Sequence, residues 1–347
     1  MISTIQENVP LAELTTFKIG GKARFFVRAK SETEIIEALE FAEQNSLDIF
    51  ILGGGSNILI ADEGFDGLVL QIALKGISTF AEKDGTIYVT ANAGEDWDEF
   101  VKICVEKNLA GIECLSGIPG FVGGTPVQNV GAYGQEVSET IVSVRCFDRR
   151  AKEIKELTNA ECGFAYRTSV FNTTRKNQYI VLAVTYALEL NGEAKIVYAD
   201  LKNYFGDKKP TLAETRNAVL KIRSAKSMVI DAADINTKSA GSFFKNPIVS
   251  KEKFAEMCAL FGDKIPSYAV DGETVKIPAA WLIEESGFQK GYVKGNVGLS
   301  TRHTLAIVNL GSAAAKDVLA LKAEIQARVK KQFSVELKPE PIFVGFN

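Results

Sequence analysis

The apolar and polar positions near the N-terminus predict a strand followed by a helix. The alternation in ARFFVRA, residues 23–29, is typical of a strand. The next segment, residues 31–45, places apolar residues on one helical face, and Ser31 with Glu34 forms the pattern of a capping box at its start. This order predicts a strand–helix unit.

A second strand, predicted over residues 48–60, is interrupted by a glycine run in DIFILGGGSNILI. Because glycine has no side chain, the backbone turns sharply there and several N–H groups stay uncovered, which suits a pyrophosphate. A glycine-rich bulge or hairpin corner gives the same pattern, and the stretch matches neither the Rossmann nor the Walker fingerprint. The residues of this loop are Gly53, Gly54, Gly55, Ser56 and Asn57.

The next elements are a strand over residues 86–94 and a helix over residues 96–108, for which Asp96 and Glu99 are the expected cap. Residues 111–137 follow as a glycine-rich segment far longer than an ordinary loop. A mobile surface loop is one interpretation, but its apolar IPGFV and PVQNV stretches favour packing against another large group. The apolar face of the helix consists of Trp97, Phe100, Val101, Cys104 and Val105.

The C-terminal third of the chain alternates helices with short strands, which predicts an α+β lobe. Its first helix begins with a capping box of Thr211 and Glu214. In the last helix, the apolar pattern spans barely two heptads and therefore favours packing on the lobe over a coiled coil. The predicted helices cover residues 210–223, 251–262, 278–287 and 313–333, and a strand covers residues 304–310.

Composition narrows the class of protein. The chain has 347 residues, of which 46% are hydrophobic and 24% charged, as expected for a soluble globular protein of about two or three domains. The net charge of −3 gives no basic field for nucleic acid. Neither a signal peptide nor a membrane-spanning segment is evident, so we expect a cytoplasmic protein without membrane insertion. The sequence gives no sign of an obligate protein partner. The five cysteines show no CxxC pair, which predicts reduced thiols and no metal site.

The stretch GSFFKNP, residues 241–247, raises the question of what Ser242 does. A serine nucleophile normally needs a base, and His303 is the one histidine of the sequence, so a Ser-His-Asp hydrolase is not favoured. Taken alone, the stretch predicts a Gly-Ser turn followed by two core phenylalanines.

Five blocks together resemble the family of UDP-N-acetylenolpyruvoylglucosamine reductases, in the longer subtype that closes a tyrosine loop over the substrate. They are GGGSN at 53–57, IPGFVGGTPVQNVGAYG at 118–134, YRTSVF at 166–171, GSFFKNP at 241–247 and PEP at 339–341. The first two blocks are also similar to the wider group of flavoproteins with an FAD-binding domain of the vanillyl-alcohol-oxidase type.

The resemblance implies an α+β fold with FAD held by two lobes and a C-terminal substrate-binding lobe. We expect the lobes at residues 1–72, 73–205 and 206–347, with the segment 336–347 returning Glu340 to the active site. The FAD should be non-covalent, because the histidine lies far from both flavin loops in sequence. Besides the GGGSN loop, the implied FAD-binding residues are Gly120, Gly123, Gly124, Gln128, Asn129 and Gly131.

In the family, NADPH is the co-substrate and the product is UDP-N-acetylmuramate for peptidoglycan. Hydride passes from flavin N5 to C3 of the enolpyruvyl group, and the serine matching Ser242 delivers a proton to C2. Arg167 would stabilise the developing negative charge, although an arginine forking onto backbone carbonyls is the commoner structural case. Glu340, between two prolines, matches the catalytic glutamate, although most glutamates near a C-terminus lie on the surface.

The resemblance carries over a further set of substrate contacts, among which Tyr198 matches the loop tyrosine and Lys226 a phosphate-contacting lysine. The segment 227–241 departs from the family pattern, which puts the placement of Lys226 in doubt. A flavin oxidase acting on a sugar or alcohol, and a flavin or nucleotide-sugar binding protein without turnover, are the alternatives. The implied substrate contacts are Tyr133, Tyr166, Tyr198, Lys226, Asn246, Tyr268, Lys276 and His303.

Overall fold

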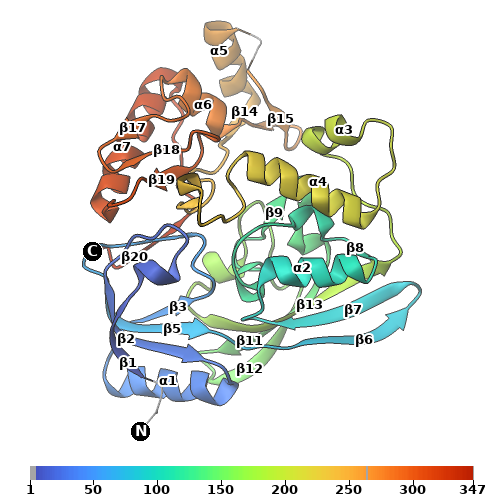
Figure 1. The fold of residues 1–347 in the computed structure, drawn as a ribbon, viewed down its shortest axis with the longest axis vertical. Helices are drawn as coiled ribbons and strands as arrows, with labels where there is room; N and C mark the ends of the chain where they lie inside the picture. Colours follow the sequence, from blue (N-terminus) through green and yellow to red (C-terminus); the bar gives the residue numbers. More distant parts are fainter. Residues whose placement is uncertain (1–4, 263–264, 347) are drawn as a thin grey trace. The chain divides into compact units, whose positions relative to one another are not determined.

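The computed structural model describes residues 5–262 and 265–346 of the chain, and these form two compact units (Figure 1). Unit 1 comprises residues 5–9, 23–55 and 66–229, and unit 2 comprises residues 10–22, 56–65 and the described residues from 230 onward. Each unit has a hydrophobic core of its own, so each is described by itself.

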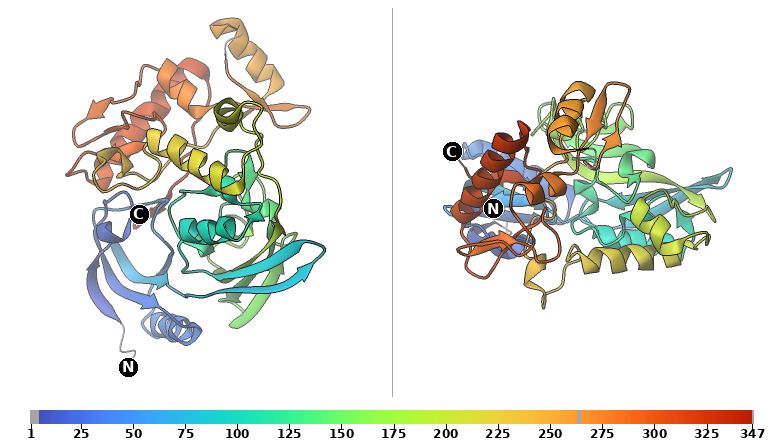
Figure 2. Two further views of the ribbon diagram at one scale, coloured as in Figure 1. Left: turned by 45° about the vertical axis from the view of Figure 1, so that its right-hand side comes forward. Right: turned by 90° about the horizontal axis from the view of Figure 1, so that it is seen from above.

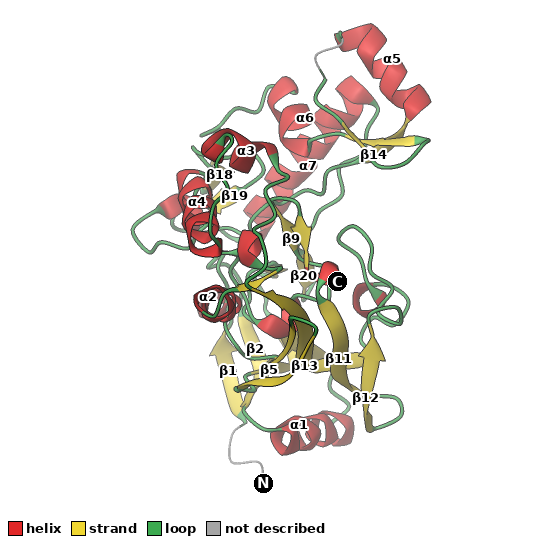
Figure 3. Ribbon diagram, turned by 90° about the vertical axis from the view of Figure 1, so that its right-hand side faces the viewer, coloured by secondary structure: helices red, strands yellow, loops and turns green. Residues whose placement is uncertain are grey.

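The first sheet of unit 1 has the strand order β1–β2–β5–β3. Strands β3 and β5 run parallel, with Ile49 opposite Leu68. The side chain of Ser31 caps helix α1 (Glu32–Gln44) by accepting a hydrogen bond from the Glu34 amide, as predicted. The buried residues of α1 share a core with this sheet. Figure 3 shows the helix beside the strands of unit 1. The strands are β1 (Gln6–Pro10), β2 (Lys22–Ala29), β3 (Ile49–Leu52) and β5 (Phe65–Ile72).

The second sheet of unit 1 is antiparallel, in the order β12–β11–β13–β7–β6, and β8 pairs with β13. Strands β6 and β7 form a hairpin that reaches far along the sheet (Figure 2). Its strands are β6 (Ile77–Lys83), β7 (Thr86–Asn92), β8 (Leu109–Ala110), β11 (Ile141–Asp148), β12 (Glu153–Thr158) and β13 (Tyr179–Leu190).

Helix α2 (Trp97–Glu106) begins at the predicted cap, where the Asp96 side chain accepts from the Glu99 amide. All five residues of its predicted apolar face are buried. The rings of Trp97 and Phe100 pack on Tyr186 of β13, with centroids 5.9 and 5.1 Å from it, which fixes the helix on the sheet.

The remaining elements of unit 1 follow the second sheet. Helix α4 begins with the predicted capping box of Thr211 and Glu214, in which both reciprocal hydrogen bonds are present. Strands β9 and β10 form a short antiparallel hairpin. The elements are β9 (Gly131–Ala132), β10 (Gln135–Glu136), α3 (Ala199–Phe205), α4 (Leu212–Ala225) and the 3-10 turns Glu113–Leu115, Val122–Gly124, Val137–Glu139 and Val170–Asn172.

Unit 2 mixes helices with short strands, as the C-terminal pattern predicts. Strands β14–β16–β15 form one sheet and β17–β18–β19 another, and β20 pairs in parallel with β4. Helix α7 (Ala315–Phe333) buries Val318, Leu321, Ile325 and Val329 in this core, so it packs within the unit as predicted. Figure 3 shows α7 beside α6.

The elements of unit 2 have the following bounds: β4 (Ile58–Ile60), β14 (Ile248–Ser250), α5 (Lys251–Phe261), β15 (Tyr268–Ala269), β16 (Thr274–Lys276), α6 (Ala279–Glu285), β17 (Val293–Lys294), β18 (Val297–Leu299), β19 (Ile307–Asn309), α7 (Ala315–Phe333) and β20 (Ile342–Val344). Two 3-10 turns, Ala12–Leu14 and Ile235–Thr237, also belong to it. The predicted strand over 304–310 is therefore shorter than expected.

Candidate functional site

The glycine loop that follows β3 is in close contact with a second glycine segment. A Cβ atom placed on Gly54 would lie 2.7 Å from the Cα of Gly120 and 3.0 Å from the Phe121 amide nitrogen. A Cβ on the neighbouring Gly53 would meet nothing within 4 Å. The predicted sharp turn is therefore a site of close backbone packing on one side and of open space on the other.

The second glycine segment is fixed by main-chain hydrogen bonds. The Trp97 amide donates to the Gly120 carbonyl, and the Gly123 amide donates to the Ala93 carbonyl at 2.9 Å. A Cβ on Gly123 would lie 2.6 Å from the Cβ of Ala93, whereas one on Gly124 would meet nothing within 4 Å. These contacts support the interpretation that the segment is packed rather than a mobile surface loop.

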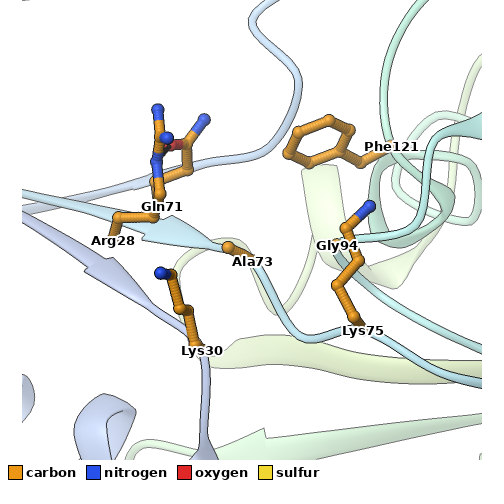
Figure 4. A pocket seen from close by; sticks show the side chains of 7 residues that line it. All are labelled: Arg28, Lys30, Gln71, Ala73, Lys75, Gly94 and Phe121. Atoms are coloured by element: carbon orange, nitrogen blue, oxygen red, sulfur yellow. Dashed lines mark hydrogen bonds between the residues drawn. The ribbon is translucent and has the colours of Figure 1, made fainter.

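A cavity of about 470 Å³ lies beside these loops, lined by residues from β2 and β5 and the turns that follow them, from the turn after β7 and from the second glycine segment (Figure 4). The Arg28 Nε donates to the Gln71 Oε1 at 2.7 Å, and the Gln71 Nε2 donates to the Gly53 carbonyl at 3.1 Å. This chain of bonds connects the cavity to the glycine loop. The lining residues are Arg28, Lys30, Gln71, Ala73, Lys75, Gly94 and Phe121.

The charges of this cavity suit an anionic ligand. Arg28, Lys30 and Lys75 contribute cations, and Lys75 also forms a 3.4 Å ion pair with Glu95. The open side of Gly53, the backbone of the loops and these cations fit FAD, whose diphosphate is anionic. Sequence reasoning missed the cavity residues; the cations that end the RAK and LQIALK stretches are the signal that could have identified them.

Backbone strain marks the predicted flavin segment and its neighbours. Asn129, Tyr133 and Arg167 have φ values of 45°, 49° and 54°, in the left-handed region that side chains larger than glycine rarely adopt. Such conformations cost on the order of 1–2 kcal/mol and are commonly found at functional sites. Sequence patterns gave no sign of this strain.

The buried Asn129 side chain organises its own loop. Its Nδ2 donates to Glu136 Oε2 at 2.8 Å and to the Ala165 carbonyl at 3.2 Å, and its Oδ1 accepts from the Ser138 amide. Since these bonds hold two segments together, the side chain of Asn129 acts as a scaffold. Cofactor binding by Gln128, Asn129 and Gly131 stays a prediction.

Arg167 reaches the same loop. Its Nη2 donates to the Gly131 carbonyl at 2.7 Å and its Nη1 to the Asn129 carbonyl at 3.4 Å, while its guanidinium lies 5.4 Å from the ring centre of Tyr166. These are the contacts of the structural alternative considered for this residue. They also place the guanidinium beside the predicted flavin segment, and its catalytic role stays a prediction.

Two of the tyrosines predicted to contact a nucleotide sugar form a pair in unit 1. The rings of Tyr133 and Tyr198 pack edge to face with centroids 5.4 Å apart, and burial raises the pKa of the Tyr133 hydroxyl. Lys226, the C-cap of α4, forms a 2.6 Å ion pair with Asp200. The structure therefore brings Tyr133 and Tyr198 together.

Arg223, one turn before Lys226 on α4, was missed by the sequence reasoning. Burial lowers the pKa of its guanidinium, and its Nη2 donates to the Met228 carbonyl at 2.8 Å. Within the described residues, the buried Nε of Arg223 has no hydrogen-bond partner. Helical periodicity alone does not show that the Nε of this half-buried arginine is enclosed.

In unit 2, the segment with Ser242 pairs with the C-terminal segment. The Glu340 amide donates to the Phe243 carbonyl, the Lys245 amide donates to the Lys338 carbonyl, and Phe244 forms an antiparallel bridge with Pro339. Glu340 thus lies opposite Phe243, the residue after Ser242. Phe243 and Phe244 are buried, as expected for core phenylalanines, while Ser242 and Glu340 are half-buried.

Asn57 of the glycine loop also contacts the C-terminal segment. Its Nδ2 donates to the Glu340 carbonyl at 3.4 Å, and its carbonyl accepts from the Ile342 amide. This register continues into the parallel pairing of β20 with β4. The backbone around Glu340 is therefore held from both sides within unit 2.

The other predicted substrate contacts of unit 2 lie on its short strands and turns. Tyr268 and Lys276 are cross-strand partners of β15 and β16 and so lie side by side. The Asn246 Oδ1 accepts from the Ala279 amide at the start of α6, which gives it a capping function. His303 is half-buried in a turn closed by the Ala306 amide.

Three further observations concern the described residues only. No cluster of three or more His, Cys, Asp or Glu side chains with metal-ligand geometry is found among them. Nor is any of their helices both long and apolar enough to cross a membrane. All five cysteines are free thiols, and four of them are buried.

Comparison with known proteins gives two family matches. Residues 23–156 match the model of an FAD binding domain, and residues 233–344 match the model described as UDP-N-acetylenolpyruvoylglucosamine reductase, C-terminal domain. The first range includes the glycine loop and the cavity, and the second includes the paired segments around Ser242 and Glu340.

Curated relatives and a solved structure cover almost the whole chain. The UDP-N-acetylenolpyruvoylglucosamine reductase of Thermobifida fusca (strain YX) is 44% identical in an alignment of 356 positions that covers 99% of each chain. That of Streptomyces coelicolor is also 44% identical and covers 99% of this chain and 92% of its own. The crystal structure of the reductase from Thermus caldophilus superimposes with a TM-score of 0.66 at 25% identity, covering 98% of this chain and 99% of its own.

Proposed function

The chain belongs to the family of UDP-N-acetylenolpyruvoylglucosamine reductases and is an FAD-binding oxidoreductase, and from this premise we propose that it reduces UDP-N-acetylglucosamine enolpyruvate to UDP-N-acetylmuramate with NADPH. The family, the α+β fold class with its FAD-binding domain and the cofactor FAD are thereby confirmed. The product would enter peptidoglycan synthesis. The lobe boundaries at residues 72 and 205 stay a prediction.

The observation that carries the proposal is the pairing of Ser242 with the C-terminal segment. The bond from the Glu340 amide to the Phe243 carbonyl keeps Ser242 and Glu340 on adjoining positions of the same small ladder. A core turn would need neither group, and an oxidase that deprotonates an alcohol would need a base rather than a hydroxyl donor. Ser242 and Glu340 are both half-buried residues.

When bound, FAD would supply hydride transfer from NADPH to the enolpyruvyl double bond. The residues of the glycine loop and of the cation-lined cavity would hold the cofactor. In our proposal Ser242 donates the proton to C2 of the substrate. Such a donor of ordinary acidity suffices because the enolate it protonates is strongly basic. Arg167 would stabilise negative charge on the substrate carboxylate, and Glu340 would donate a hydrogen bond or proton to the enolate.

Measuring the two half-reactions separately tests the proposed role of Ser242. Ser242→Ala should retain bound FAD and its reduction by NADPH, while reduction of the enolpyruvyl substrate slows by about 100-fold to 10,000-fold, the usual contribution of general acid catalysis. Stopped-flow absorbance of the flavin under anaerobic conditions follows each half-reaction separately.

A neighbouring serine provides the control. Ser239 is buried, and its Oγ accepts from the Gly241 amide at 3.2 Å in the same turn. Ser239→Ala should therefore disturb the turn and yet retain most of the substrate half-reaction. Equal loss of both half-reactions in Ser242→Ala, or an equal effect of Ser239→Ala on the second one, would make Ser242 a structural residue.

A further inference from the structure

Glu113 is a fully buried carboxylate that the proposed chemistry does not use. It lies in the 3-10 turn Glu113–Leu115 with 0% of its surface exposed. Burying a charged side chain costs free energy unless hydrogen bonds compensate for it. The contacts of Glu113 therefore indicate what it holds in place.

Three N–H groups from separate segments of the described chain donate to the two oxygens of Glu113. The Gly111 amide donates to Oε2 at 2.8 Å. The Gln135 Nε2 and the Lys195 amide donate to Oε1 at 2.8 and 3.0 Å. Because an ionised carboxylate only accepts hydrogen bonds, it matches this set of donors in a way that an amide cannot.

Neighbouring contacts strengthen the same junction. The Gln135 Oε1 accepts from the Cys114 amide at 2.7 Å, so Gln135 is held at both ends of its amide. The Lys195 carbonyl accepts from the Cys114 thiol at 3.4 Å, and Lys195 Nζ forms a 2.7 Å ion pair with Glu139. Burial, and after it the Glu113 charge, raises the pKa of the Cys114 thiol, which keeps this donor protonated.

The segments joined by Glu113 are the ones that carry Tyr133 and Tyr198. Tyr133 precedes Gln135 in the β9–β10 hairpin, and Tyr198 follows Lys195 three residues later. The two segments touch directly, because a Cβ on Gly134 would lie 2.4 Å from the Val197 Cγ2. The rings of Tyr133 and Tyr198 are 5.4 Å apart.

We propose that Glu113 is a positioning residue that fixes the segment of Tyr198 to the hairpin of Tyr133, so that both tyrosines are presented together to the nucleotide-sugar substrate. This assignment rests on the proposed function, because that function is what makes the two tyrosines substrate contacts. Glu113 does not contact the substrate; it acts through the Lys195 amide and the Gln135 side chain.

The test compares Glu113→Gln with Asp148→Asn. Asp148 is an equally buried carboxylate that accepts from the amides of Arg150 and Ala151 in the β11–β12 hairpin, so it controls for the loss of a buried charge elsewhere in unit 1. In Glu113→Gln, one amide hydrogen must face an N–H donor, which breaks part of the junction while preserving the volume of the side chain.

Two readouts are expected to change together. Amide hydrogen exchange of residues 191–198 should accelerate at least tenfold in Glu113→Gln and stay as in the wild type in Asp148→Asn. The KM for UDP-N-acetylglucosamine enolpyruvate should rise about tenfold in Glu113→Gln, with kcat and the rate of FAD reduction by NADPH within about threefold of the wild type. If Glu113→Gln only destabilised the fold, less of the protein would be folded and all of the measured rates would fall together.

The outcomes distinguish this assignment from the proposed function. Wild-type exchange at residues 191–198 in Glu113→Gln would overturn the positioning assignment, as would faster exchange with an unchanged KM. A wild-type enzyme that does not turn over the enolpyruvyl substrate would overturn the proposed function, while the exchange result would still decide whether Glu113 holds the two segments. If Glu113→Gln does not fold, Gln135→Met removes one of the three donors and should give the same two effects at smaller size.

Discussion

The paired glycines Gly53 and Gly54 allow a sharp test of the FAD loop, because adding one methyl group to each has opposite structural consequences. On Gly54 the new Cβ would lie 2.7 and 2.9 Å from backbone atoms of Gly120, which cannot rotate away. On Gly53 the Cβ would meet no atom of the protein within 4 Å. Neither glycine is among those with a positive φ, so the strain of a left-handed backbone does not oppose alanine at either position.

The magnitudes follow from these contacts. Overpacking of this kind costs about 1–3 kcal/mol, so Gly54→Ala should lower the free energy of unfolding of the FAD-free protein by that amount. Gly53→Ala should leave this free energy within about 0.5 kcal/mol of the wild type or raise it slightly. If the open side of Gly53 is where the diphosphate lies, its methyl group should weaken FAD binding at least tenfold, or about 1.4 kcal/mol.

The assay combines urea denaturation of the FAD-free protein with titration of FAD by flavin fluorescence. Gly123→Ala and Gly124→Ala provide a second matched pair. A Cβ on Gly123 would lie 2.6 Å from the Cβ of Ala93, whereas a Cβ on Gly124 would meet no atom within 4 Å. Wild-type stability of Gly54→Ala would refute the packing argument. Wild-type affinity for FAD in Gly53→Ala would refute the placement of the diphosphate at this loop.

Three further predictions concern the other candidate residues. Arg167→Lys loses the two hydrogen bonds of the guanidinium to the Gly131 and Asn129 carbonyls. In stopped-flow traces, the substrate half-reaction should slow about 100-fold while FAD reduction by NADPH stays nearly unchanged. Loss of FAD binding instead would make Arg167 a structural residue. Burial alone would raise the pKa of the Asp148 carboxyl, but hydrogen bonds from the Ala151 and Arg150 amides and from Lys155 and Gln178 bring it down to about 2. This pKa lies below the unfolded value of about 3.9, so the ionised carboxylate contributes roughly 2 kcal/mol to the free energy of unfolding above about pH 4, and this contribution is lost as the pH falls toward 2. Asp148→Asn should therefore flatten the dependence of the free energy of unfolding on pH over that window. An unchanged pH dependence in chemical denaturation would contradict the assignment. Asp200→Asn releases Lys226 from its ion pair and should tighten binding of a UDP-sugar two- to fivefold in calorimetry, whereas Lys226→Ala should weaken it; equal affinities in both variants would remove Lys226 from the diphosphate site.

Local sequence signals predicted the elements that depend on neighbouring residues. The caps at Ser31, Asp96 and Thr211 were identified because a capping side chain and its partner are three residues apart in the chain. The buried face of α7 was identified because its period matches the helix. Such signals need no knowledge of distant contacts.

Features that depend on distant contacts could not be predicted in this way. The parallel pairing of β20 with β4 joins residues that are more than 280 positions apart, so no local pattern encodes it. The cavity beside the glycine loop depends on Arg28 and Gln71 meeting across β2 and β5. In the sequence, Glu113 is one of many polar loop residues. Its role depends on the hydrogen bonds that it accepts from Gln135 and Lys195, which are distant in the chain.

The resemblance supplied the family, and the comparisons confirm it, but the roles of single residues need chemistry to test them. Arg167 illustrates the difference: the motif predicts a catalytic residue, whereas its guanidinium also donates to two backbone carbonyls of its own unit. Asn246 likewise matches a predicted substrate contact and caps α6. Both residues are compatible with two roles, and only kinetics can separate them.

The most direct test of the central claim follows the visible absorbance of the flavin in the purified protein without oxygen, first on adding NADPH and then on adding UDP-N-acetylglucosamine enolpyruvate. We predict bleaching by NADPH and recovery of the oxidised spectrum by the enolpyruvyl substrate, with formation of UDP-N-acetylmuramate. Bleached flavin that recovers only when oxygen is admitted would contradict the proposed reaction and favour an oxidase, and a flavin that NADPH does not bleach would contradict the first half-reaction.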